Sequence, residues 1–211
     1  RHSEDKVTPH TRPPADDDAD HMLVRTVQCL DGQVEIELVC EPIFDYGQVP
    51  ATWSLADGDD GIADATGGDQ MFRLGTDLSL GIEGERVRAR HHLNAGDRAY
   101  CALSWAHELE TPSDVDDAES RIAATVRFWR TWLDRARVPD HRWREPIQRS
   151  ALAVKGLPYV PTGATVAALT TSLPETPGGE RNWDYRFMWI RDSTFTLQAL
   201  HFLNLDWEAE E

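Results

Sequence analysis

The chain has 211 residues, of which 40% are hydrophobic and 27% are charged, as in an ordinary globular protein. Its 37 acidic and 21 basic residues give a net charge of −16. Nucleic acids and anionic membranes are bound by basic surfaces, so this charge argues against both as partners, whereas a sugar or another small molecule remains compatible. This length is enough for one large core or two small ones.

The cysteines and the apolar runs also limit the class of protein. Cys29, Cys40 and Cys101 lie in strand-like segments and are expected to be buried, reduced thiols. No Cys-x-x-Cys or His-x-x-x-His spacing is present, so we predict no metal site. No apolar run reaches the roughly 18 residues of a membrane span and no signal peptide is recognisable, which favours a cytoplasmic protein. Because the chain starts at Arg1 and ends at Glu211, we expect it to be part of a longer protein.

The N-terminal half has the pattern of a β-rich domain. Residues 1–21, with their prolines and aspartates, are predicted to be a disordered lead-in. Residues 22–110 alternate between apolar and polar positions, and the Gly/Asp-rich stretch 57–69 is predicted to be a turn region. The alternation is clearest at residues 34–39, where the side chains expected to face inward are Val34, Ile36 and Leu38. Several short strands separated by turns predict an antiparallel β-sandwich.

The period then changes to that of helices. Residues 111–140 carry apolar residues at steps of three and four and are predicted to form a linker helix, with Ser113 as its N-cap. A second helix is predicted from Pro146 to Gly156, followed by a long loop over residues 157–183. A third helix should begin near Ser193. The change from strands to helices suggests two domains.

Residues 181–192 combine aromatic rings, arginines and aspartates more densely than any other part of the chain. A pyranose ring has apolar faces that pack on aromatic rings, and its hydroxyls both donate to carboxylates and accept from guanidinium groups. This stretch is therefore a candidate sugar-binding site.

Each residue of this stretch also has a structural interpretation. Asp192 could cap the third helix, although Ser193 is an equally suitable cap. Arg191 could form an ion pair with Asp192 or Asp184. The aromatic residues could belong to the core, as residue type alone suggests: Trp183, Tyr185 and Trp189.

Several motifs around this stretch resemble glycoside hydrolase family 15, and residues 22–110 resemble the β-sandwich of its bacterial members. The motifs are Lys155-Gly-Leu, Pro161-Thr-Gly-Ala, Thr170-Thr-Ser-Leu-Pro-Glu, Gly178-Gly-Glu-Arg-Asn-Trp-Asp-Tyr-Arg and Trp189-Ile-Arg-Asp. The resemblance implies a sandwich followed by an (α/α)6 barrel, of which residues 141–211 are the beginning. For the whole protein it implies inverting hydrolysis of α,α-trehalose to glucose, with a glucoamylase or glucodextranase acting on α-glucan ends as the alternative. A non-catalytic carbohydrate-binding or assembly module is a further alternative for the sandwich.

The resemblance also assigns roles to individual residues. Arg191 and Asp192 would hydrogen-bond the released glucose, Tyr185 and Trp189 would line its pocket, and two further residues would lie behind them: Trp183 and Asp184. The catalytic glutamates would come from barrel helices beyond Glu211, so no catalytic residue is assigned and the isolated chain is expected to be inactive. Dependence on phosphate and Mg²⁺ follows from the resemblance alone, since no motif here would hold either, and a homo-oligomer remains open.

Overall fold

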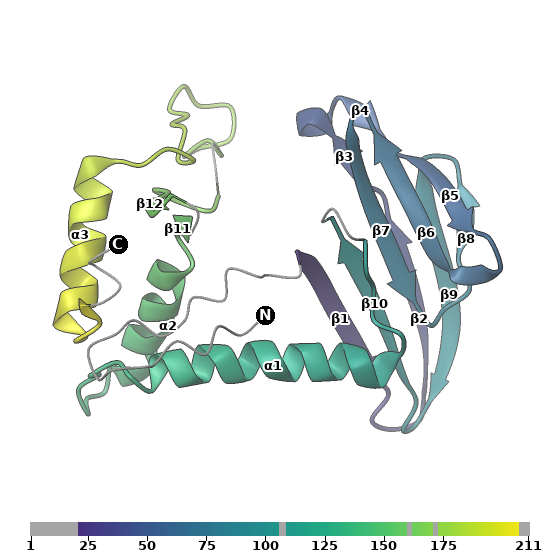
Figure 1. Cartoon of the computed structure of the whole chain (residues 1–211), viewed down its shortest axis with the longest axis horizontal. Helices are drawn as coiled ribbons and strands as arrows, with labels where there is room; N and C mark the ends of the chain where they lie inside the picture. Colours follow the sequence, from purple (N-terminus) through teal and green to yellow (C-terminus); the bar gives the residue numbers. More distant parts are fainter. Residues whose placement is uncertain (1–20, 106–108, 160–161, 171–172, 207–211) are drawn as a thin grey trace. The chain divides into compact units, whose positions relative to one another are not determined.

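The computed structural model describes residues 21–105, 109–159, 162–170 and 173–206, so nearly all of the predicted lead-in lies outside the described residues. The chain divides into two compact units, and the boundary between them falls between Thr125 and Val126 (Figure 1). Each unit is described by itself below.

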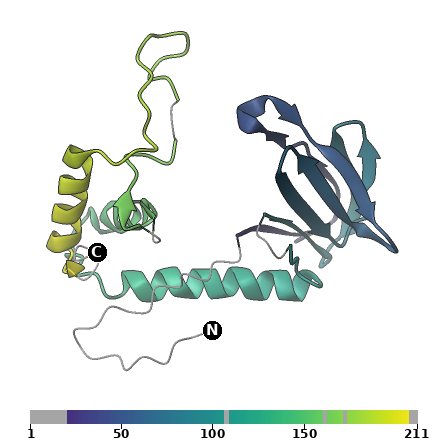
Figure 2. The same ribbon diagram turned by 45° about the horizontal axis from the view of Figure 1, so that its top comes forward.

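The first unit consists of antiparallel sheets (Figures 1 and 2). A five-stranded sheet has the order β1-β10-β7-β6-β5, a three-stranded sheet has the order β2-β9-β8, and β3 and β4 form a short pair. The strands are β1 (Met22–Gln28), β2 (Gln33–Cys40), β3 (Ile43–Phe44), β4 (Val49–Pro50), β5 (Thr52–Ala56), β6 (Asp59–Gly67), β7 (Gln70–Thr76), β8 (Gly81–Glu83), β9 (Arg86–Asn94) and β10 (Arg98–Ser104).

The inner faces of the two larger sheets share one hydrophobic core, consistent with the predicted β-sandwich. Ala63 in β6 and Val87 in β9 are fully buried in it. The alternation predicted for β2 is confirmed at Ile36 and Leu38, which pack against this core, whereas Val34 near the start of the strand is exposed. Alternate side chains of β2 therefore face the five-stranded sheet across the core.

The Gly/Asp-rich stretch 57–69 was predicted to be a turn region, and this prediction was wrong over most of its length. Residues 59–67 form β6, whose buried positions are occupied by small residues: Gly61, Ala63, Ala65 and Gly67. A Cβ atom on Gly67 would collide with the ring of Phe44, and one on Gly61 would collide with the carbonyl oxygen of Thr76. The small side chains thus fit a tightly packed strand, although their type is more common in turns.

The outer face of β10 carries the first turns of helix α1 (Val115–Leu133). Tyr100 and Ala102 of β10 form a buried cluster with Ala118 of the helix. The Tyr100 hydroxyl donates to the Pro112 carbonyl at 2.7 Å, and burial raises the pKa of this hydroxyl to about 12. The residues before the helix are therefore fixed to the sheet.

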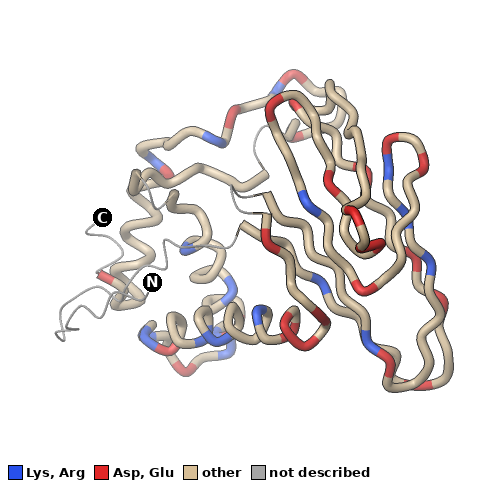
Figure 3. Tube along the Cα trace, turned by 45° about the vertical axis from the view of Figure 1, so that its right-hand side comes forward, with Lys and Arg blue, Asp and Glu red and all other residues tan. Residues whose placement is uncertain are grey.

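Ion pairs add to this attachment. Arg98 of β10 reaches the carboxylates of Asp116 at 2.8 Å and Glu119 at 2.6 Å. Acidic residues gather at the start of α1 (Figure 3), where they also offset the positive end of the helix dipole.

The N-cap of α1 is one residue later than predicted. Asp114 accepts the backbone N–H of Asp117 at 2.8 Å, and Asp117 reaches back to the N–H of Ser113 at 3.2 Å. Because the first bond runs from the backbone N–H of the third helical residue to the Asp114 side chain, Asp114 replaces Ser113 as the capping residue.

The second unit contains the end of α1, two further helices and a small hairpin. The elements after α1 are α2 (Arg144–Lys155), β11 (Pro158–Tyr159), β12 (Ala164–Thr165) and α3 (Ile190–Phe202). Its core comprises Trp132, Ala151, Leu200 and Leu205. The stretch 157–183, predicted to be a loop, thus contains the β11–β12 hairpin, and α2 begins two residues before Pro146. Among the described residues, no helix is long and apolar enough to cross a membrane.

We predict that Gly67→Ala destabilises the first unit by about 1–3 kcal/mol, because the new methyl group enters the space of the Phe44 ring. Urea denaturation followed by β-sheet circular dichroism measures the effect. Gly81→Ala in β8 is the matched control, since its Cβ would meet only ordinary contacts, and should change stability by less than about 0.5 kcal/mol. Equal stability of the two variants would contradict the packing of β6 described above.

A second prediction concerns the start of α1. Asp114→Ala should cost about 1 kcal/mol because the N–H of Asp117 loses its acceptor. Ser113→Ala should cost less than about 0.5 kcal/mol. Thermal unfolding of both variants compares them directly, and a larger loss for Ser113→Ala would restore Ser113 as the cap.

Candidate functional site

The aromatic and charged stretch 181–192 lies between the β11–β12 hairpin and α3, and continues into the first turn of that helix (Figure 1). Backbone hydrogen bonds fix it at two places. The N–H of Glu175 donates to the carbonyl of Arg181 at 3.2 Å, and the N–H of Ala167 donates to the carbonyl of Tyr185 at 3.0 Å. These bonds connect the stretch to the residues that precede it.

Asp184 organises the middle of the stretch. One carboxylate oxygen accepts the backbone N–H of Arg186 at 3.0 Å, and the other accepts from the Arg186 guanidinium at 2.7 Å. The first bond closes an Asx turn. The Arg186 side chain holds the pKa of the Asp184 carboxyl below its usual value. The carbonyl of Asp184 accepts the indole N–H of Trp189 at 3.3 Å, so the turn also orients that ring.

The rings of Tyr185 and Trp189 lie nearly parallel. Their centroids are 6.2 Å apart with an interplanar angle of 18°, and both residues are half-buried. The Arg191 guanidinium lies 5.5 Å from the centre of the Trp189 ring, within the range of a cation–π contact. Three of the predicted substrate-binding residues are therefore neighbours.

The fourth, Asp192, accepts a hydrogen bond from Arg191 at 3.1 Å. This is one of the two ion pairs that the sequence left open for Arg191; the other candidate, Asp184, is paired with Arg186 instead. The contact is solvent-accessible, with 67% of the Arg191 side chain and 34% of the Asp192 side chain exposed. The guanidinium has five N–H donors, so the pair leaves donor capacity for a ligand.

Helix α3 begins earlier than predicted, which removes the capping interpretation of Asp192. Its N-cap is Trp189, without a side-chain capping bond, and the N–H of Ser193 already donates to the Trp189 carbonyl at 2.9 Å. Asp192 therefore lies within the first turn, where its charge is favourable to the helix dipole. The start of α3 was not predicted correctly because its N-cap is an aromatic residue, which is not a recognisable capping residue in the sequence.

Trp183 lies apart from this group. Its indole N–H donates to the Glu175 carboxylate at 3.3 Å, and the residue is 48% exposed, so the core interpretation was wrong for it. Conversely, Arg186 was missed as a site residue. Its spacing of two from Asp184 is the one signal that could have indicated it.

In the part of the chain that the structure describes, no three residues of the types His, Cys, Asp and Glu lie close enough together to hold a metal ion. No step proposed below uses Mg²⁺ or phosphate.

Comparison with known proteins supports a class for the second unit. Residues 142–211, which include α2, α3 and the whole candidate site, match the family described as Glycosyl hydrolases family 15. This confirms the resemblance predicted from the motifs of residues 155–192.

The relatives that match nearly the whole chain are trehalases. The chain is 49% identical to the trehalase of Mycolicibacterium smegmatis over 96% of its own length and 31% of that protein. It is 48% identical to the Mycobacterium tuberculosis trehalase, over 96% of the chain and 30% of the relative. The trehalase of Thermoplasma volcanium is 32% identical over 89% of the chain and 29% of the relative. The chain thus spans less than a third of the length of these relatives.

The Asp184–Arg186 pair gives a prediction that depends on pH. Arg186→Met should raise the pKa of Asp184 toward its ordinary value, because the guanidinium that stabilises the carboxylate is lost. In the native chain, the depressed pKa means that the stabilisation by the pair is present at neutral pH and is lost as the pH falls through that pKa. Side-chain ¹³C NMR titration of Asp184 measures this change.

The matched control for this titration is Arg191→Met. It removes an equal charge that is paired with Asp192 instead, so it should leave the Asp184 titration unchanged. Equal changes in both variants would show that the general field, and not the Arg186 contact, sets the pKa.

Proposed function

We propose that the protein containing this chain hydrolyses α,α-trehalose to glucose. The observation that carries the proposal is the identity of 49% with a trehalase, extending over 96% of the chain and thus over both units. Similarity of the second unit alone would support only the broader glycosidase class.

The proposed architecture is a β-sandwich at residues 22–110, a linker at residues 111–140, and the beginning of an (α/α)6 barrel from residue 141. The helices of the second unit support the last assignment. Leu200 is buried in the core of this unit, whereas Phe195 and Phe202 of α3 are 63% and 73% exposed. Further barrel helices would cover such apolar side chains.

Within this architecture, the candidate site forms part of a glucose pocket. The Tyr185 and Trp189 rings present apolar surface to a face of the sugar. The remaining N–H donors of Arg191 and the carboxylate of Asp192 pair with neighbouring hydroxyls, one as donor and the other as acceptor. Arg186, acting through the Asp184 turn, keeps the Trp189 ring in place.

Bond cleavage requires groups that we place outside this chain. Inverting hydrolysis uses two carboxyl groups about 6.5–9.5 Å apart, one protonating the leaving oxygen and the other activating water. Glu175 is bonded to Trp183 and lies within 4 Å of Arg181, and we assign it no catalytic role. The isolated chain is therefore proposed to be inactive. A cytoplasmic location belongs to the same proposal; a homo-oligomer remains open, and phosphate and Mg²⁺ follow from the family resemblance alone.

The substrate is tested by assaying the full-length protein on trehalose and on maltose. Release of glucose from trehalose is expected. Glucose from maltose alone would contradict the proposal and favour the glucoamylase alternative.

The role of the pocket predicts the effect of Asp192→Ala in the full-length protein. A hydrogen bond to a charged group contributes about 1.5–3 kcal/mol, so kcat/KM on trehalose should fall roughly 10- to 100-fold while the melting temperature stays near that of the native protein. The exposed Asp134, at the end of α1, supplies the control, since Asp134→Asn should leave kcat/KM unchanged. Loss of thermal stability with little loss of kcat/KM would instead show that Asp192 is structural.

A further inference from the structure

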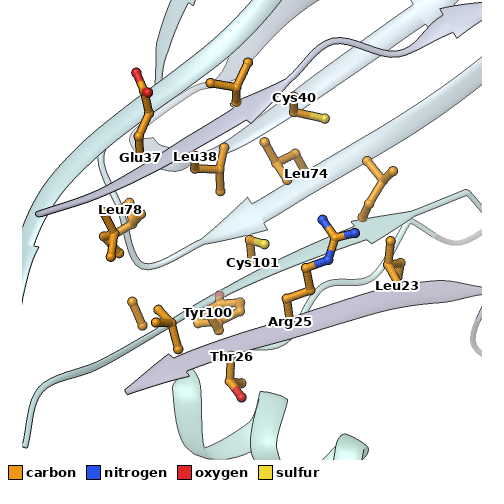
Figure 4. Close-up of a pocket in the computed structure, with 15 residues that line it drawn as sticks. Leu23, Arg25, Thr26, Glu37, Leu38, Cys40, Leu74, Leu78, Tyr100 and Cys101 are labelled. Carbon is orange, nitrogen blue, oxygen red and sulfur yellow. The ribbon is translucent and has the colours of Figure 1, made fainter. Parts of the chain in front are cut away.

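The sandwich contains a cavity of about 410 Å³ that opens along one side (Figure 4). Its walls come from β1, β10 and β7 of one sheet and β2 of the other. Both β1 and β2 are end strands of their sheets, so no further strand closes this side within the described residues. Most of the lining is aliphatic, and exposed apolar side chains continue it outward from the end strands: Leu23, Val27 and Val39.

One cationic residue, Arg25, lines the open side of this apolar space and is itself exposed to solvent. Alternation along β1 places Arg25 on the same face as Leu23 and Val27, directly opposite Cys101 of β10. Figure 4 shows its guanidinium turned into the space near Cys101 and Leu74. Among the described residues, the Arg25 side chain forms no ion pair or hydrogen bond.

No neighbouring group on the cavity wall supplies a negative charge that pairs with Arg25. Glu37 also lines the cavity, but its carboxylate is paired with Arg88 and Arg90 and points away from Arg25 (Figure 4). Burial raises the pKa of the Cys40 thiol to about 11 and raises that of Cys101 in the same direction. Both thiols are therefore neutral at pH 7, and Arg25 has no anionic partner on the cavity wall.

We propose that this cavity binds an aliphatic carboxylate, with its hydrocarbon chain between the sheets and its carboxylate paired with Arg25. The volume falls within the roughly 300–1,000 Å³ of small-molecule sites, which are mostly apolar with a few polar groups that fix orientation. A guanidinium pairs with a carboxylate through two parallel hydrogen bonds. The mostly aliphatic walls match a saturated chain.

The competing explanation is that Arg25 protects an edge. Natural sheets place inward-pointing charges on end strands to prevent pairing with other chains. Under that explanation any charged residue at position 25 would serve equally well, and no ligand would be bound. The sign of the charge therefore separates the two explanations.

The test measures binding of decanoate to the full 211-residue chain by isothermal titration calorimetry. Acetate is the probe that lacks the hydrocarbon tail, and decyltrimethylammonium is the probe that keeps the tail but carries a positive charge. The native chain should bind decanoate and neither of the others. Arg25→Lys should retain binding, whereas Arg25→Glu should weaken decanoate binding at least about tenfold and create binding of decyltrimethylammonium.

Arg86→Glu is the matched control, because Arg86 lies on β9, contacts Glu83 and does not line the cavity. It should leave decanoate affinity unchanged. If Arg25→Glu does not fold by circular dichroism, Arg25→Gln replaces it, with the same tenfold loss expected. Absence of decanoate binding to the native chain, or equal decanoate affinity after the charge at position 25 is reversed or removed, would overturn the proposal.

Discussion

The fold of the first unit depends on burial of both faces of β10. Ala99 faces the sandwich core, whereas Tyr100 and Ala102 face the start of α1. A strand exposed on one face could place polar residues there, but β10 must satisfy two apolar neighbours at once. The buried Tyr100 hydroxyl is accordingly hydrogen-bonded to the carbonyl of Pro112. One strand thus fixes both the spacing of the sheets and the position of the helix that follows.

The fold was predictable where pattern alone decides it. Alternation identified β2, and helical periodicity identified α1, because each signal arises from one element facing one core. β6 was not predictable, since glycine and alanine there reflect the proximity of Phe44 and Thr76, which only the tertiary structure reveals. The open side of the cavity could not be predicted from the sequence either. Strand pairing, and not local sequence, determines that β1 and β2 are end strands.

For the candidate site, composition predicted the region and the structure supplied the roles. The density of rings and charges indicated Tyr185, Trp189 and Arg191, which are indeed neighbours. The pairing of charges was not predictable, because three arginines and two aspartates within twelve residues allow several combinations. In the structure, Asp184 pairs with Arg186 and Asp192 pairs with Arg191. The first pair shapes the backbone turn, and the second remains accessible to solvent.

The attachment of α1 to the sheet has a consequence for where this protein can be divided. Sequence periodicity ends the β-domain near Glu110, yet the acceptor of the Tyr100 hydroxyl is at residue 112 and the acidic partners of Arg98 are at residues 116 and 119. Ala118, which covers the outer face of the sheet, is also beyond that point. A sandwich excised at Glu110 would therefore expose apolar strand surface and a buried phenol. The first turns of the helix belong to the domain that they cover.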